Sequence, residues 1–181
     1  MSYTIEELDA GAAAKSVEAL AAVLVDCVEG GASVNFMWPF PRERAVTFWE
    51  GVAAKVARGD AILLVARDGA GICGTVHLST AVPENQPHRA DVTKMLVHRR
   101  ARRQGIGLAL LRGIEACAAA AGRTTLVLDT VTGSDAERLY LRAGWNVCGV
   151  IPNYALFPDG RPCATTVFWK EVGWKVIADG T

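Results

Sequence analysis

The sequence predicts a mixed α/β (α+β) fold around one central sheet. Apolar runs at residues 61–67 and 71–80 bracket a DGAG turn, a pattern typical of an antiparallel hairpin. An alternating strand at 88–98, an apolar helix at 105–121 and an apolar strand at 124–130 then follow one another directly. Such a β-α-β unit pairs its two strands in parallel, so the sheet must contain both orientations.

The elements before this hairpin follow from hydrophobic periodicity. We expect a short strand over residues 2–7 and an alanine-rich amphipathic helix over 9–29, which Gly30 and Gly31 end. An aromatic-rich loop, GASVNFMWPFP, leads to a second helix over 42–58.

The elements after the crossover complete the sheet. A helix is expected over 134–143, where Gly144 ends it, and the segments WNVCGVI and ATTVFWKEV flank a PDG loop as a last hairpin. The total is about seven strands, antiparallel at the N-terminal end, flanked by about four helices. No repeat or linker interrupts residues 1–181, so we expect a single domain.

Composition limits the class of protein. The 181 residues carry 19 basic and 19 acidic side chains, a balance that argues against a nucleic-acid or anionic-membrane partner. Five scattered cysteines without a CxxC pair and three scattered histidines indicate neither a zinc site nor a disulfide framework. Neither a signal peptide nor an apolar run of the roughly 20 residues that span a bilayer is evident. We therefore expect a cytoplasmic protein with free thiols and no metal.

One stretch, RRARRQGIGLALL at residues 99–111, gathers arginines directly before glycines. The first N–H groups of a helix lack intrahelical partners and the helix dipole adds positive charge, so a bare helix start can hold phosphate. Gly105 and Gly107 leave this backbone accessible, and Arg102 and Arg103 could reach the same phosphates. The same sequence is also compatible with an irregular helix start and solvated arginines. A P-loop and a dinucleotide fingerprint do not, because leucines stand where they require lysine and glycine.

Two linked patterns resemble the GNAT N-acetyltransferases. A strand, TKMLVH, leads into Arg102-x-x-Gly105-x-Gly107 and an apolar helix, which resembles the acetyl-CoA signature of that family. Further along, the family pattern of alanine, tyrosine, glycine and an aromatic residue is matched by Ala136, Tyr140, Gly144 and Trp145. Within the family, the stretches GGASVNFM, RADVTKMLV, LDTVTGS and PDGR are similar to tabtoxin-resistance-type acetyltransferases.

The resemblance implies a GNAT fold with acetyl-CoA as the acetyl donor and without a metal. It implies that a bulge splays the strand before the glycines, where Met95, Leu96 and Val97 would meet the pantetheine arm and the thioester oxygen. The pyrophosphate would lie on Arg102, Arg103, Gln104, Gly105, Ile106, Gly107 and Leu108. Ser134 could replace the asparagine that the family often carries at the position of Gly133.

Amide formation from a thioester needs a base for the amine and an acid for the departing thiolate. Neutralising a lysine-like amine, with a pKa of about 10.4, at pH 7 costs about 4 to 5 kcal/mol, and a carboxylate can take that proton. The resemblance makes the Tyr140 hydroxyl the acid and assigns the carboxylates to Asp129 and Asp91. Core packing would also explain Tyr140, turn capping would explain Asp129, and a solvated strand edge would explain Asp91.

The family places the acceptor opposite the coenzyme, between the first inter-helix loop and the last hairpin loop. Both loops are aromatic here, and Phe36, Trp38 and Tyr154 are the candidate acceptor-binding residues, although such rings also pack loops onto a core. We expect direct acetyl transfer in a ternary complex to a primary amine of a small molecule, such as an amino acid, toxin or antibiotic-like compound. The alternatives are a protein or peptide N-terminal acetyltransferase and a non-catalytic CoA-binding sensor. GNAT proteins frequently dimerise, which leaves a homodimer open.

Overall fold

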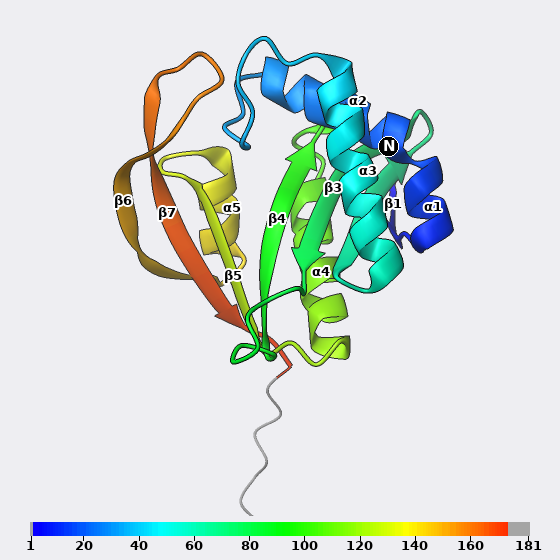
Figure 1. Ribbon diagram of the computed structural model, residues 1–181. Coiled ribbons are helices and arrows are strands. Elements are labelled where there is room, and N and C mark those ends of the chain that lie inside the picture. The colour runs from blue at the N-terminus through cyan, green and yellow to red at the C-terminus, as the bar shows by residue number, and fades with distance from the viewer. Residues whose placement is uncertain (1, 174–181) are drawn as a thin grey trace, which may run out of the picture.

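A computed structural model describes residues 2–173, which form one seven-stranded sheet and five α-helices (Figure 1). The strands are β1 (Thr4–Glu7), β2 (Ala61–Asp68), β3 (Gly71–Ser79), β4 (Arg89–Val97), β5 (Thr125–Val131), β6 (Asn146–Leu156) and β7 (Pro162–Glu171). The helices are α1 (Ala10–Lys15), α2 (Val17–Glu29), α3 (Arg42–Arg58), α4 (Ile106–Ala120) and α5 (Asp135–Arg142). The strand order is β1-β2-β3-β4-β5-β7-β6, and only β4 and β5 are parallel, joined through α4. The predicted mixed sheet is confirmed.

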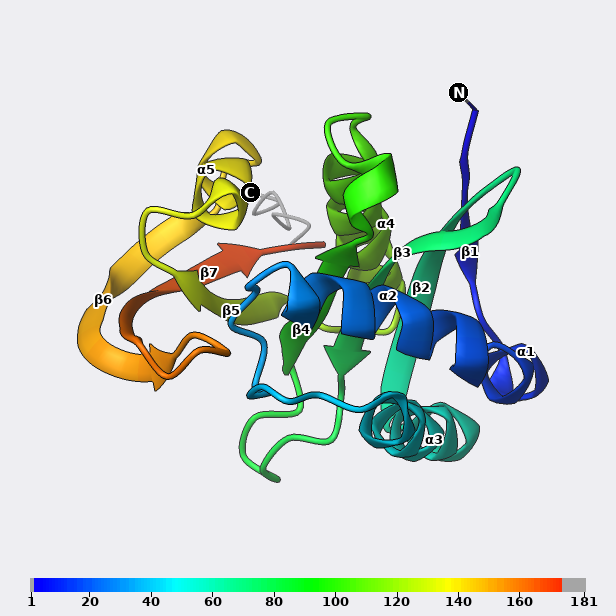
Figure 2. The same cartoon turned by 90° about the horizontal axis from the view of Figure 1, so that it is seen from above.

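Helices cover both faces of the sheet. Helices α1, α2 and α3 lie on one face, and α4 and α5 lie on the other (Figure 2). Alternating side chains of the central strands therefore enter two cores. On β2, for example, Leu64 packs in the core under α4, whereas Leu63 packs in the core under α2 and α3. The edge strand β6 is exposed along most of its length.

The helix predicted over residues 9–29 is wrong in one respect, because the chain forms two helices there. The Asp9 side chain accepts a hydrogen bond from the Ala12 N–H at 2.7 Å and begins α1. The Ser16 N–H donates to the Ala13 carbonyl at 3.1 Å, which ends α1 in a tight turn, and α2 begins at Val17. Apolar residues continue on both sides of Ser16, so periodicity does not reveal the break.

The parallel strands β4 and β5 stay paired over a short distance only. Their register runs from Arg89 with Thr125 to Asp91 with Val127 and goes no further. Beyond this point the two strands diverge toward their carboxyl ends (Figure 1). The opposite edge of β4 remains paired with β3 as far as Val97. The sheet is therefore split at its centre, and the outer half of β4 has an edge that β5 does not cover.

A bulge in β4 accompanies this split. Thr93 pairs with His77 and Leu96 pairs with Thr75, so β4 contains one residue more than β3 over this interval. Lys94 lies in the bulge with a positive φ of 51°. The bulge also changes the face of the sheet to which the β4 side chains point. Val92 packs under α4, whereas Leu96, four residues later, packs under α2 and α3. The bulge that the family resemblance implied is confirmed.

Candidate active site

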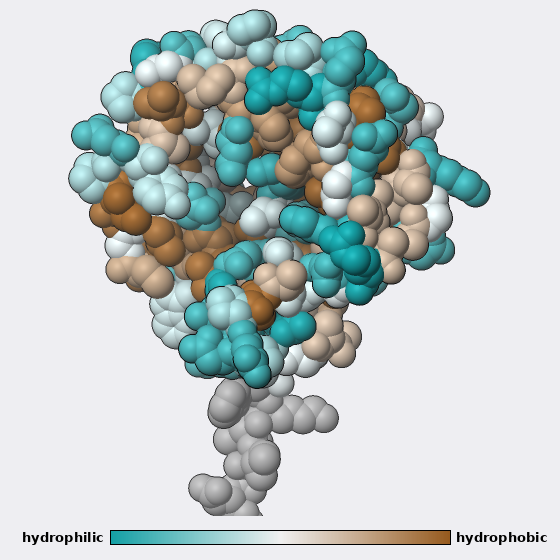
Figure 3. All heavy atoms as spheres, viewed as in Figure 1, coloured by the Kyte–Doolittle hydropathy of each residue, from teal (hydrophilic) through white to brown (hydrophobic). Residues whose placement is uncertain are grey.

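The split sheet opens into a hollow on the molecular surface. Figure 3 shows this depression between the β4 side of the molecule and the β6–β7 hairpin. Two loops meet above it, because the Ser33 hydroxyl donates to the Leu156 carbonyl at 2.7 Å and the Trp38 N–H donates to the Pro158 carbonyl at 3.0 Å. The predicted proximity of the first inter-helix loop and the last hairpin loop is thus confirmed.

The glycine-rich turn is exposed and shaped by left-handed backbone. Arg103 and Gly105 have positive φ angles of 64° and 81°, and Gly105 is the N-terminal cap of α4. Within the described residues no side chain caps this helix start. The N–H groups of the first turn are therefore available to a ligand, as an anion site requires.

Gly107 has a packing role that the sequence did not indicate. A Cβ at this position would lie 3.1 Å from Leu139 Cδ2 on α5, which is closer than ordinary van der Waals contact. The small residue therefore lets α4 and α5 approach each other. Gly105 is different, because its positive φ, rather than lack of space, explains the glycine.

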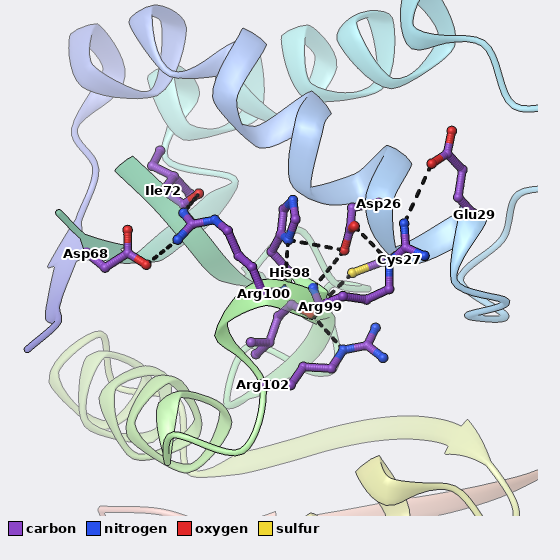
Figure 4. Close-up of polar contacts among 10 residues, drawn as sticks. Asp26, Cys27, Glu29, Asp68, Ile72, His98, Arg99, Arg100 and Arg102 are labelled. Atoms are coloured by element: carbon purple, nitrogen blue, oxygen red, sulfur yellow. Dashed lines mark hydrogen bonds and ion pairs between the residues drawn. The ribbon is translucent and has the colours of Figure 1, made fainter. Parts of the chain in front are cut away.

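Two of the four clustered arginines anchor the turn (Figure 4). Asp26 on α2 accepts two hydrogen bonds from Arg99, one from the backbone N–H and one from Nε, both at 2.8 Å. Arg100 forms an ion pair with Asp68 at the end of β2. Both guanidinium groups are thus engaged within the protein and hold the turn against α2 and β2.

Arg102 lies against the free end of β4. Its Nε donates to the Val97 carbonyl at 3.1 Å, and the Cys27 thiol approaches the same oxygen at 3.6 Å (Figure 4). This contact connects the turn to the strand that the resemblance assigns to the thioester. The side chains of Arg102, Arg103 and Gln104 are exposed at the rim of the turn.

Tyr140 on α5 is buried in the core that α4 covers. It is 4% exposed, and its ring packs against Trp145 and Phe168, with centroid distances of 6.0 and 5.8 Å. Burial raises the pKa of the Tyr140 phenol, and the nearby Asp129 carboxylate raises it further. The hydroxyl therefore keeps its proton throughout the neutral range and can act as an acid but not as a base.

The two candidate carboxylates differ in their surroundings. Asp91 forms an ion pair with Arg89 on its own strand. Asp129 forms neither an ion pair nor a side-chain hydrogen bond with any residue of the described chain. Asp129 is accessible to water, yet the surrounding protein displaces enough solvent to raise its pKa. Lys94 opposes this rise and Asp91 adds to it. Asp129 is thus the carboxylate better placed to exchange a proton.

Sequence reasoning missed Lys94 and His77. The His77 ring is 5% exposed, its Nδ1 lies 2.9 Å from Thr93 Oγ1, and burial together with Lys55 and Lys94 lowers its pKa to about 4. Lys94 is half-buried beside the rings of Phe36 and Phe48. No signal in the sequence could have placed Lys94 here, because strand alternation without the bulge would have turned it to the other face.

The aromatic residues predicted for the acceptor side have different environments. Phe36 is half-buried and packs against Phe40 at 4.5 Å and Phe48 at 5.5 Å between centroids. Trp38 is 48% exposed, and its Nε1 donates to the Val28 carbonyl at 3.1 Å. Tyr154 on β6 is 56% exposed. Of the three, only Phe36 contacts the Lys94 side of the hollow.

Ser134 caps helix α5. Its hydroxyl accepts a hydrogen bond from the Glu137 N–H at 3.1 Å, and Glu137 Oε2 accepts from the Gly133 N–H at 2.6 Å. These two bonds hold the start of the helix that carries Tyr140. The capping bond uses the Ser134 oxygen as an acceptor and leaves its proton free to donate.

The described residues contain no group of three or more His, Cys, Asp or Glu side chains arranged to hold a metal ion. Over the same part of the chain, none of the helices has the length and apolarity needed to cross a bilayer.

A bare helix start beside a split parallel strand pair defines a site for a phosphate-bearing ligand with an extended arm. The family model described as an acetyltransferase (GNAT) domain matches residues 59–147, which include β2 to β5, α4 and Tyr140. These residues therefore form a GNAT acetyltransferase domain.

Several solved structures share this fold. An N-acetyltransferase from Staphylococcus aureus Mu50 is 17% identical, with 94% of this chain and 99% of that chain covered and a TM-score of 0.77. A GNAT superfamily phosphinothricin acetyltransferase from Sinorhizobium meliloti, solved with AcCoA, is 17% identical, with coverages of 100% and 94% and a TM-score of 0.76. A ribosomal-protein-alanine N-acetyltransferase from Brucella melitensis is 21% identical, with coverages of 93% and 99% and a TM-score of 0.73. The fold is therefore shared by proteins named for small-molecule and for protein acceptors.

Proposed function

We propose that this protein transfers an acetyl group from acetyl-CoA to a primary amine of a small molecule by direct attack in a ternary complex. The observation that carries the proposal is the position of Tyr140, buried with a protonated hydroxyl beside Asp129, where β4 and β5 separate. A buried acid next to an unpaired carboxylate, at an opening in the sheet, supplies the two proton transfers that amide formation needs.

The residues at the turn fit the substrate acetyl-CoA. The uncapped N-terminus of α4, with Gly105 and Gly107, would bind the pyrophosphate, and the exposed Arg102 and Arg103 would add charge-assisted hydrogen bonds. The remaining members of the proposed set are Gln104, Ile106 and Leu108 in the same turn, Met95, Leu96 and Val97 on β4, and Ser134 at the start of α5. After the bulge, the backbone of β4 is no longer paired with β5. The amide groups of a pantetheine arm could form hydrogen bonds with this open edge in place of β5.

The proposed chemistry uses Asp129 and Tyr140 in sequence. Asp129 accepts a proton from the acceptor ammonium, directly or through water, and the neutral amine attacks the thioester carbonyl. The C–N bond forms as the C–S bond breaks, and Tyr140 gives its proton to the departing thiolate. The new amide nitrogen then loses its second proton, which returns to Tyr140 through water and restores the phenol. Asp91 remains paired with Arg89 and supports Asp129 through charge. No covalent intermediate on the protein is required.

A small acceptor is favoured over a protein N-terminus. The contacts Ser33–Leu156 and Trp38–Pro158 close the two loops over the hollow, whereas a peptide acceptor requires an open groove. Phe36, Trp38 and Tyr154 are proposed to line this side. A CoA-binding sensor would need neither the buried acid nor the unpaired carboxylate.

We place the reaction in the cytoplasm, a proposal that the five free cysteines support. A homodimer is also proposed, with β6 as the interface. This edge strand exposes large apolar side chains, among them Val150, 53% exposed, and Ile151, 44% exposed. Exposed apolar edges usually mark sites of association. A sedimentation coefficient that stays that of a monomer at high concentration would exclude the dimer.

The experiment that tests the function measures release of free CoA thiol from acetyl-CoA during incubation with a panel of small amines and, separately, with peptide N-termini. Thiol release that depends on a small amine, with an acetylated product of the expected mass, is the result that supports the proposal. Release with peptides alone would establish the alternative acceptor. Calorimetric binding of CoA without any turnover would identify a sensor.

A further inference from the structure

Lys94 has an unusual position for a charged side chain. It lies in the β4 bulge with a φ of 51°, on the side of the sheet that faces α3 and the aromatic loop. Its Nζ lies 5.3 Å from the centroid of the Phe48 ring and 5.9 Å from that of Phe36. The bulge and the two rings therefore hold one ammonium group at the wall of the acceptor side.

This ammonium lacks a polar partner within the described chain. Lys94 forms neither an ion pair nor a hydrogen bond there, whereas Arg89, Arg99 and Arg100 all do. Asp129 acts on it only as a more distant charge. Cation–π contacts offset part of the desolvation of a half-buried ammonium, but they leave its three N–H donors unused. An oxyanion from a ligand would satisfy these donors.

The charges around the hollow limit that ligand to a single negative charge next to an amine. Asp91 is paired with Arg89, so Lys94 and Asp129 are the positive and the negative group of this region that have no ion-pair partner in the described chain. A ligand with one ammonium and one carboxylate matches this pair, with the ammonium toward Asp129 and the carboxylate toward Lys94. A dianion such as a phosphate monoester would leave an uncompensated charge in the hollow.

We propose that Lys94 binds the carboxylate of the acceptor, so that the acceptor is an amino acid or a closely related zwitterion. This inference rests on the proposed function and names the substrate class of the same site. Lys94 is then a residue that determines specificity, and it takes no part in the proton transfers.

The test compares each proteinogenic amino acid with the amine in which hydrogen replaces its carboxylate, using thiol release from acetyl-CoA. We expect the best amino acid to exceed its decarboxylated partner by about 100-fold in kcat/KM, because a buried group built to bind a polar atom rejects the analogue that lacks it. Lys94→Gln should remove this preference by raising KM for the amino acid, with little change for the decarboxylated amine. Lys94→Arg should restore part of the preference, and Lys55→Gln on the exposed face of α3 is the matched control.

A binding measurement makes the inference testable without turnover. Deaminated acids, such as 3-phenylpropionate and 4-methylpentanoate, should bind the CoA-saturated protein by calorimetry, and Lys94→Gln should weaken this binding at least about tenfold. Equal activity with both members of every pair, or equal binding of the acids by wild type and Lys94→Gln, would overturn the inference. If any amine still causes thiol release in that case, the proposed acetyl transfer stands. If no amine reacts and the protein does not bind CoA, the proposed function itself is refuted.

Discussion

Gly107 on α4 and Leu139 on α5 are in such close contact that a methyl group on Gly107 would lie 3.1 Å from Leu139 Cδ2. Leu139 directly precedes Tyr140, so the spacing of the two helices links the phosphate turn to the proposed acid. The glycine can thus serve packing, ligand approach or both. These roles make different predictions for a pair of variants.

Gly107→Ala should weaken CoA binding about tenfold, a loss of about 1.4 kcal/mol. Leu139→Ala creates room for the added methyl group. If packing is the reason for the glycine, the double variant should bind CoA better than Gly107→Ala alone, as calorimetry of all four proteins would show. If the methyl group blocks the pyrophosphate itself, Leu139→Ala will provide no rescue, and the packing explanation would be wrong.

Tyr140→Phe should lower kcat by about 100-fold, because it removes the proton donor for the thiolate. The ring contacts with Trp145 and Phe168 remain, so the melting temperature and the Kd for CoA should stay close to those of the wild type. Steady-state kinetics with calorimetry check both expectations. Full turnover by this variant would eliminate Tyr140 as the acid.

Asp129→Asn should reduce kcat/KM by about 100-fold or more, whereas the matched variant Asp91→Asn should cost less than about tenfold. Burial raises the pKa of Asp129, and only its ionised form accepts a proton, so activity should rise as the pH passes upward through this raised pKa. Asp129→Asn should abolish that acidic limb of the pH–rate profile. If the acidic limb stays unchanged in Asp129→Asn and disappears in Asp91→Asn, the base is Asp91.

The buried His77 should make the free energy of unfolding depend on pH. Its pKa is about 4 in the folded protein against an ordinary value of 6.5, so between these values the unfolded chain binds the proton and the folded protein does not. Stability should therefore fall as the pH decreases from 6.5 to 4, by about 3 kcal/mol from this residue. Urea unfolding of the wild type and of His77→Asn over this range measures the difference. Parallel stability curves for the two proteins would contradict a neutral buried His77.

Much of the fold follows from local sequence. The hairpin of β2 and β3, the helix α3 and the crossover through α4 are set by apolar periodicity and by the residues that end each element, and these need no long-range information. The same holds for the helix start at Gly105 and for the helix position of Tyr140. Spacing thus indicated the phosphate turn, and the resemblance to the GNAT family indicated Tyr140 as the candidate acid.

Tertiary structure decided the rest. The split of β4 from β5, the one-residue bulge at Lys94 and the contact of Gly107 with Leu139 depend on residues far apart in the chain. The same is true of the different states of Asp91 and Asp129, which arise from an ion pair in one case and from solvent displacement in the other. Periodicity assigns each residue to a face only while the strand remains regular, and a single inserted residue reverses that assignment. The sequence therefore determined which groups the protein has for chemistry, and folding determined which of them meet.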